Sequence, residues 1–187
     1  MKASNDRLVW VDLEMTGLDV ATNTILEMAT IITDNDLEII AEGPELIIHH
    51  KLADLEKMDE WNTKHHTESG LWTKALESKI TLAEAVVLTK DFILEYCETG
   101  SSPLCGNSIG QDKLFLAKYM PEIIDILHYR VIDVSSFKEM INRWFPQEIS
   151  QTNFIKKGQH RALEDIKESI HELKHYRRHF ISHHIDC

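Results

Sequence analysis

The stretch "VWVDLEMTGLD", Val9 to Asp19, places two acidic residues in what reads as a buried strand. Leu8 to Leu13 is an apolar run that only Asp12 interrupts, which is typical of a central strand. Side chains two residues apart on a strand share a face, so Asp12 and Glu14 are predicted neighbours. The run offers no cation, and two close carboxylates in an apolar setting are unfavourable unless a positive group meets them.

Strands come first along the chain, and helices and strands alternate afterwards. Two more strands are predicted over residues 25–33 and 37–49, joined by the polar turn "DND", so the first three strands form a meander. A short strand is predicted at "LCGNS" and another over residues 129–134. This order predicts an α/β fold with a mixed central sheet and helices on both of its faces.

Three helix starts are predicted, two of them from a capping signal. Thr81 with Glu84, and Ser108 with Gln111, have the spacing of a capping box, in which each side chain bonds to the other's backbone amide. The last helix is predicted to begin at His160 or Arg161.

Size and composition describe an ordinary globular protein. The chain has 187 residues, of which 43% are hydrophobic and 27% charged, and we expect one domain over residues 1–187. No run has the apolar length of a membrane span, and the first residues do not resemble a signal peptide. Cys97, Cys105 and Cys187 form neither a zinc pattern nor a disulfide framework, which predicts the reducing cytoplasm.

The net charge of -11 restricts the kinds of nucleic acid that the protein can bind. Long nucleic acids are held mainly through contacts between basic patches and phosphates. The charge therefore argues against a long duplex as the partner. A short nucleic acid, held by few contacts and by metal ions, stays compatible with it.

Three later residues are candidates to join Asp12 and Glu14. Asp112 and Asp165 each lie in the first turns of a predicted helix, and His160 precedes the second of these helices. Carboxylates without cysteine suit Mg²⁺ or Mn²⁺, two of which can clamp a phosphodiester while a histidine takes a proton from water. The alternative is that both aspartates only complement helix dipoles and that His160 is a helix-entry residue.

The motifs "DLEMTGLD", "GNSIGQD" and "HRALEDI" resemble the three exonuclease motifs of the DEDD superfamily. The histidine five residues before the last aspartate is similar to that of the DEDDh branch. From about Leu8 to Tyr176 the chain resembles the oligoribonuclease family more closely still, through "WVDLEMTGLD", "ILEMATIITD", "MDEWNTKHHTESGL", "CGNSIGQD" and "HYRVIDVSS".

The resemblance implies an RNase H-like exonuclease fold and a 3′-to-5′ exoribonuclease. The implied substrates are very short oligoribonucleotides, above all dinucleotides, which are cut to 5′-mononucleotides. By position in the motifs, two divalent ions, Mg²⁺ or Mn²⁺, would be bound by Asp12, Glu14, Asp112 and Asp165. His160 would be the general base.

The resemblance also implies substrate contacts and a homodimer. Leu18 would wedge against the bases and Trp61 would stack on one of them. The 5′ phosphate end would be held by Ser108, Arg130, Ser135 and His66, and Tyr129 and Arg130 would reach the active site from the partner subunit. The ordinary alternatives are that Trp61 and Leu18 serve packing and that Tyr129 is a structural residue of a strand start.

Two other functions remain as alternatives. A DEDDh exonuclease that proofreads DNA or trims longer RNA would need a more basic approach surface than a charge of -11 indicates. A catalytically inactive member that only binds nucleotides or a protein would be expected to lack some of the five catalytic positions, and all five are intact in this chain.

Overall fold

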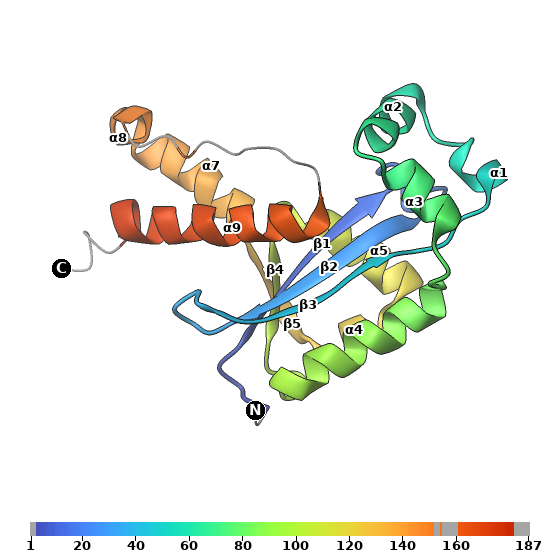
Figure 1. The fold of residues 1–187 in the computed structure, drawn as a ribbon. Coiled ribbons are helices and arrows are strands. Elements are labelled where there is room, and N and C mark those ends of the chain that lie inside the picture. The colour runs from blue at the N-terminus through green and yellow to red at the C-terminus, as the bar shows by residue number, and fades with distance from the viewer. Residues whose placement is uncertain (1–2, 152–153, 155–160, 182–187) are drawn as a thin grey trace.

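The computed structural model describes residues 3–151, 154 and 161–181, and in this part of the chain a five-stranded sheet forms the centre of the fold (Figure 1). The strand order is β3-β2-β1-β4-β5, so the apolar run from Leu8 lies in the middle strand, as predicted. The strands are β1 (Leu8–Met15), β2 (Ile25–Thr33), β3 (Ile39–Ile47), β4 (Pro103–Gly106) and β5 (His128–Asp133). β2 is antiparallel to both of its neighbours, β1 and β3, and β4 and β5 run parallel to β1. The predicted meander and the mixed sheet are confirmed.

Alternate residues of β1 enter two different cores, one on each face of the sheet. Val9, Val11 and Leu13 belong to one core, whereas Leu8 and Trp10 belong to the other. The first core is covered by α4 (Leu82–Tyr96), α5 (Ile109–Tyr119) and α6 (Pro121–Ile126), and the second by α7 (Val134–Trp144) and α9 (Ala162–Tyr176). Figure 1 shows α9 above the sheet and α4 below it. Helices on both faces are therefore confirmed.

Three short helices form a separate layer at the end of β1 and β2 (Figure 1). They are α1 (Leu52–Leu55), α2 (Glu60–Glu68) and α3 (Leu71–Glu77). Leu26 of β2 packs there against Leu55 and Leu71 in a small third core. The remaining elements are α8 (Pro146–Gln151) and a π-helical turn that extends α9 (Arg177–Ile181). In the described residues, no helix has both the length and the apolar character of a membrane span.

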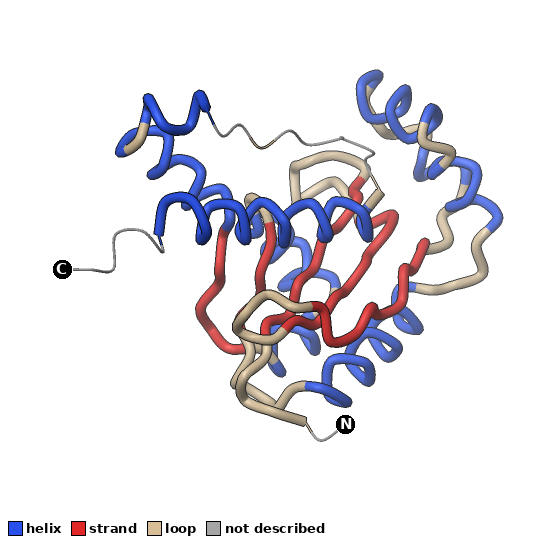
Figure 2. Tube along the Cα trace, turned by 60° about the vertical axis from the view of Figure 1, so that its left-hand side comes forward, coloured by secondary structure: helices blue, strands red, loops and turns tan. Residues whose placement is uncertain are grey.

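The carboxyl ends of β1, β4 and β5 lie at one edge of the sheet, because the three strands run in the same direction. Figure 2 shows the strands of the sheet side by side, with helices on both sides of them. β4 leads into α5 and β5 leads into α7, so both helices begin at this edge. In open α/β sheets, ligands bind in the crevice outside the carboxyl ends of parallel strands. The topology thus predicts a ligand site at this edge of the sheet, where Asp12 and Glu14 lie near the carboxyl end of β1.

Of the two predicted capping boxes, the one at Thr81 and Glu84 is confirmed, and the prediction of one at Ser108 and Gln111 is wrong. The Thr81 side chain accepts from the Glu84 amide, and the Glu84 side chain accepts from the Thr81 amide. Ser108 precedes α5 in a left-handed conformation (φ 51°) and makes no capping hydrogen bond. Its hydroxyl lies instead 3.1 Å from the hydroxyl of Ser135, at the start of α7.

Candidate active site

Asp12 and Glu14 lie on the face of β1 that α9 covers. They continue the alternation of Leu8 and Trp10, which pack against α9. Leu13, between them, points into the opposite core. The prediction that the two carboxylates share a face is confirmed by this alternation.

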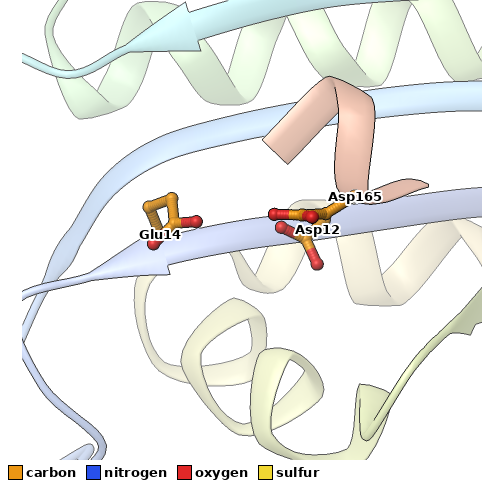
Figure 3. A group of neighbouring side chains, drawn as sticks. All are labelled: Asp12, Glu14 and Asp165. Carbon is orange, nitrogen blue, oxygen red and sulfur yellow. The ribbon is translucent and has the colours of Figure 1, made fainter. Parts of the chain in front are cut away.

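A third carboxylate reaches the pair from α9. Asp165 lies in the first turn of this helix, and Figure 3 shows it meeting Asp12, with Glu14 farther along the same strand. One carboxylate oxygen from each of Asp12, Glu14 and Asp165 lies within 4.8 Å of the others. Residues 151 positions apart in the sequence therefore form one cluster of oxygen ligands.

Asp112 approaches the same place from the other layer of the fold. It lies on α5, is buried, and its Oδ1 accepts a hydrogen bond from the Leu13 amide at 3.0 Å. Asp112 is not part of the tightest oxygen group, but its charge acts on Asp12. The four predicted metal ligands are thus brought to one region of the molecule.

The pKa values record how unfavourable this cluster is without a cation. Burial, followed by the charges of Asp112 and Glu14, raises the pKa of Asp12 well above its usual range. Burial and the charge of Asp165 raise the pKa of Glu14 to about 8. Burial raises the pKa of Asp112 to about 7. A divalent cation would remove this penalty, and an all-oxygen donor set fits Mg²⁺ or Mn²⁺.

Glu27 is a fifth acidic residue, which the sequence analysis missed. It faces Glu14 in the β1–β2 register, and its side chain has 0% exposure. Arg161 Nη2 pairs with Glu27 Oε1 at 2.9 Å and also with Glu45 on β3. Within the described residues, Glu27 Oε2 has no hydrogen-bond partner. A glutamate in the otherwise apolar run "ILEMATIIT" was the signal for it.

Leu18, Trp61 and His66 surround one hollow of about 180 Å³ that Glu14 also lines. Leu18 and Trp61 are 74% and 67% exposed, so neither serves the core. Gly17 holds the loop before Leu18: its φ is 154°, and a Cβ there would lie 2.7 Å from Asn23 Oδ1. These three predicted substrate residues therefore lie together, beside the carboxylates.

His66 and Trp61 are fixed by contacts within this hollow. His66 Nε2 lies 2.9 Å from the Met15 carbonyl, at the end of β1. Burial lowers the pKa of His66 below its usual value. Trp61 stacks on His65 with ring centres 4.9 Å apart, and His65 is a second residue that the sequence analysis missed.

Ser108 and Ser135 form a pair at the carboxyl ends of β4 and β5. Besides the contact of their hydroxyls, the Ser108 amide donates to Ser135 Oγ at 2.8 Å. The amides of both serines also donate to Asp133 Oδ1. The pair lies at the same edge of the sheet as the carboxylates.

Tyr129 and Arg130 lie away from this edge. They are near the start of β5, where Val131 is level with Val9 rather than with Asp12. Tyr129 is two strands away from Asp12 and three to four residues lower along the strand direction. This puts their Cα atoms on the order of 15 Å apart. Tyr129 is 70% exposed, and Arg130 lies over its ring. His160 lies outside the described residues.

Comparisons with known proteins agree on one group of relatives. A family model described as exonuclease matches residues 9–173. The oligoribonuclease of Haemophilus ducreyi is 51% identical over 180 residues, which are 96% of this chain and 97% of that protein. The oligoribonuclease of Marinobacter nauticus is 52% identical over 178 residues, 95% of this chain and 98% of that protein.

Solved structures support the fold. Pop2p of S. pombe, in its Mg²⁺- and Mn²⁺-bound form, has a TM-score of 0.71 at 16% identity over 96% of this chain and 86% of its own. An exonuclease I from Methylocaldum szegediense has a TM-score of 0.66 at 16% identity over 92% of this chain. This chain spans 40% of that exonuclease I chain. The predicted RNase H-like exonuclease fold is confirmed.

Proposed function

The chain belongs to the exonuclease family and within it to the oligoribonucleases, and we propose that it removes 5′-mononucleotides from the 3′ end of very short RNA. Dinucleotides are its main substrate. The observation that carries this proposal is the meeting of Asp12, Glu14 and Asp165, from two distant parts of the chain, within 4.8 Å.

Asp12, Glu14, Asp112 and Asp165 would hold two divalent ions, Mg²⁺ or Mn²⁺. The raised pKa values of Asp12, Glu14 and Asp112 support this, because such carboxylates gain most from a bound cation. When bound, the ions would activate a water molecule and stabilise the leaving oxygen of the phosphodiester.

His160 would take the proton from the attacking water. A histidine has an ordinary pKa close to neutrality and suits this task. Its neighbour Arg161 is the N-cap residue of α9, the helix that carries Asp165. The proposed base and one proposed metal ligand therefore belong to one short segment of the chain.

The hollow beside Glu14 would receive the bases. Leu18 would wedge against them and Trp61 would stack on one, which needs no particular base. The 5′ phosphate end would be held by His66, Ser108 and Ser135, together with Arg130. A closed 5′ end limits the length of the substrate, and a dinucleotide has few phosphates, which suits a chain of net charge -11.

The protein would act as a homodimer in which the partner subunit's Tyr129 and the partner subunit's Arg130 complete each site. Two facts support this arrangement: Tyr129 is 70% exposed, and it lies on the order of 15 Å from Asp12 of its own chain. We place the dimer in the cytoplasm, in keeping with the free, buried thiols of Cys97 and Cys105.

A digestion series tests the activity. RNAs of two to about ten nucleotides, spanning the reach of a short capped site, are incubated with Mg²⁺ or with a chelator. We expect the rate to be highest on the dinucleotide, 5′-mononucleotides as products, and no reaction with the chelator or with Asp12→Asn. Faster cutting of the longer RNAs, or of single-stranded DNA, would favour a trimming or proofreading exonuclease instead.

A further inference from the structure

A hydrogen-bond network of polar side chains lies behind the Ser108–Ser135 pair, and Asn107 is at its centre. Asn107 Nδ2 lies 2.7 Å from Ser169 Oγ and 3.0 Å from Glu172 Oε2. Asn107 Oδ1 lies 3.2 Å from Ser135 Oγ. Ser169 and Glu172 belong to α9 and are buried, Glu172 with 1% exposure. The network therefore joins α9 to the edge where α5 and α7 begin.

The direction of each hydrogen bond in this network is fixed by the donors and acceptors that the side chains offer. Glu172 has Lys138 Nζ at 3.7 Å as its cation, and a carboxylate only accepts hydrogen bonds. Tyr176 Oη donates to Glu172 Oε1 at 2.7 Å. Asn107 must turn its NH2 group to Glu172, because its carbonyl oxygen there would meet a second acceptor.

Ser169 independently requires the same orientation of the Asn107 amide group. Its hydroxyl donates to the Asp165 carbonyl at 2.8 Å, which uses its single proton. Toward Asn107 it therefore accepts. Both N–H groups of the Asn107 amide are thus committed, and its Oδ1 is left as an acceptor that faces Ser135.

The consequence falls on the serine pair. Ser135 donates its only hydroxyl proton to Asn107 Oδ1, and its oxygen accepts from the Ser108 amide. Ser108 Oγ has no such acceptor among the described residues other than Ser135 itself, 3.1 Å away. The left-handed conformation of Ser108 is what brings its hydroxyl there. Of the two hydroxyl protons, only that of Ser108 is available to a ligand.

We propose that Asn107 is a positioning residue that takes the hydroxyl proton of Ser135 and so leaves Ser108 as the hydroxyl donor to the substrate's 5′-terminal phosphate. This inference rests on the proposed function of the serine pair. It makes the two serines unequal: Ser108 donates to the phosphate, whereas Ser135 holds Ser108 in place. Through Ser169, the same amide is tied to the turn of α9 that carries Asp165.

The test compares dinucleotides with and without a 5′-terminal phosphate. The measured quantity is kcat/KM for the phosphorylated dinucleotide divided by kcat/KM for the unphosphorylated one. We expect Ser108→Ala to lower this ratio by about ten- to a hundredfold, the effect of one hydrogen bond to a charged group. Ser135→Ala should lower it by much less. An equal loss in the two variants would overturn the proposal.

A double variant gives a readout that a structural role would not produce. Asn107→Ala removes the acceptor of the Ser135 proton, which then becomes free to reach the phosphate. Added to Ser108→Ala, it should restore a large part of the lost ratio. If Asn107→Ala does not fold, Asn107→Leu serves instead, because leucine is close to asparagine in size and also offers no acceptor to Ser135. Failure of a folded double variant to restore the ratio would contradict the inference.

The wild-type protein separates this inference from the proposed function. If wild type does not hydrolyse dinucleotides, or does not distinguish the phosphorylated one, the assignment of the serine pair is wrong, and this inference is wrong with it. If wild type shows the preference and both serines contribute equally, only the role of Asn107 is wrong.

Discussion

Asp112 Oδ1 accepts a hydrogen bond from the amide of Leu13, the residue between Asp12 and Glu14. β4 ends at Gly106 and pairs with β1 only at Val9 and Trp10, so this amide has no strand partner on that side. A carboxylate from α5 occupies the place that a longer strand would fill. Because β4 is short, Asp112 can reach the acidic cluster. Its hydrogen bond to the Leu13 amide also holds the segment of β1 that carries Asp12 and Glu14.

Asp112→Asn should abolish turnover and leave the protein folded. The asparagine carbonyl can still accept from the Leu13 amide, so the strand is held, but the negative charge that a metal needs is gone. The measurements are dinucleotide hydrolysis and the melting temperature in chelator. Asp125→Asn, at an exposed position of α6, is the matched control and should keep full activity. Near-normal turnover of Asp112→Asn would remove this residue from the site.

The stability of the metal-free protein should fall as the pH rises from about 4 to about 8, the window between the unfolded and folded pKa values of Glu14 and Asp112. Both folded pKa values are raised, so the folded state binds more protons than the unfolded chain in this window. Folding is therefore favoured at the acidic end. A divalent ion replaces these protons, so Mg²⁺ should raise the melting temperature more at the alkaline end.

Melting curves in chelator and in Mg²⁺, taken at both ends of this window, check the sign. Asp12→Asn is the control, because it removes a carboxylate whose own pKa is raised by burial and by the charges of Asp112 and Glu14. In this variant the decline of the melting temperature with pH should be smaller. A metal effect that is equal at both ends would show that the carboxylates are not coupled to metal binding.

The sequence predicted what depends on local periodicity and missed what depends on contacts between distant segments. The shared face of Asp12 and Glu14 follows from the two-residue repeat of a strand. The ion pair of Glu27 and Arg161 joins residues 134 positions apart: the apolar run around Glu27 marks that residue as unusual, but nothing near it identifies Arg161 as its partner. The capping prediction at Ser108 was wrong because the backbone there is left-handed, and its hydroxyl turns to a residue 27 positions away.

Tyr129→Ala should be inactive alone and should regain activity when it is co-expressed with Asp12→Asn. In a two-fold dimer that shares Tyr129, the mixed dimer has one complete site. Mixed dimers are half of an equal mixture, so about a quarter of wild-type activity is expected. Co-expressing Asp12→Asn with Asp112→Asn is the matched control and should give none, because every site then lacks a ligand. No recovery with Tyr129→Ala would mean that Tyr129 does not act across the interface.

Arg161→Ala should lower the free energy of unfolding by about 3 kcal/mol at neutral pH, because removing one member of a buried ion pair leaves the other uncompensated. The uncompensated residue is Glu27, with 0% exposure beside Glu14, and urea unfolding in chelator measures the loss. Glu45→Gln is the control: it removes the more exposed carboxylate of the same arginine, and about 1 kcal/mol or less is expected. Adding Glu27→Gln to Arg161→Ala should recover much of the stability, since an amide needs no cation. If Glu45→Gln costs as much as Arg161→Ala, the arginine acts through β3 and not through the buried glutamate.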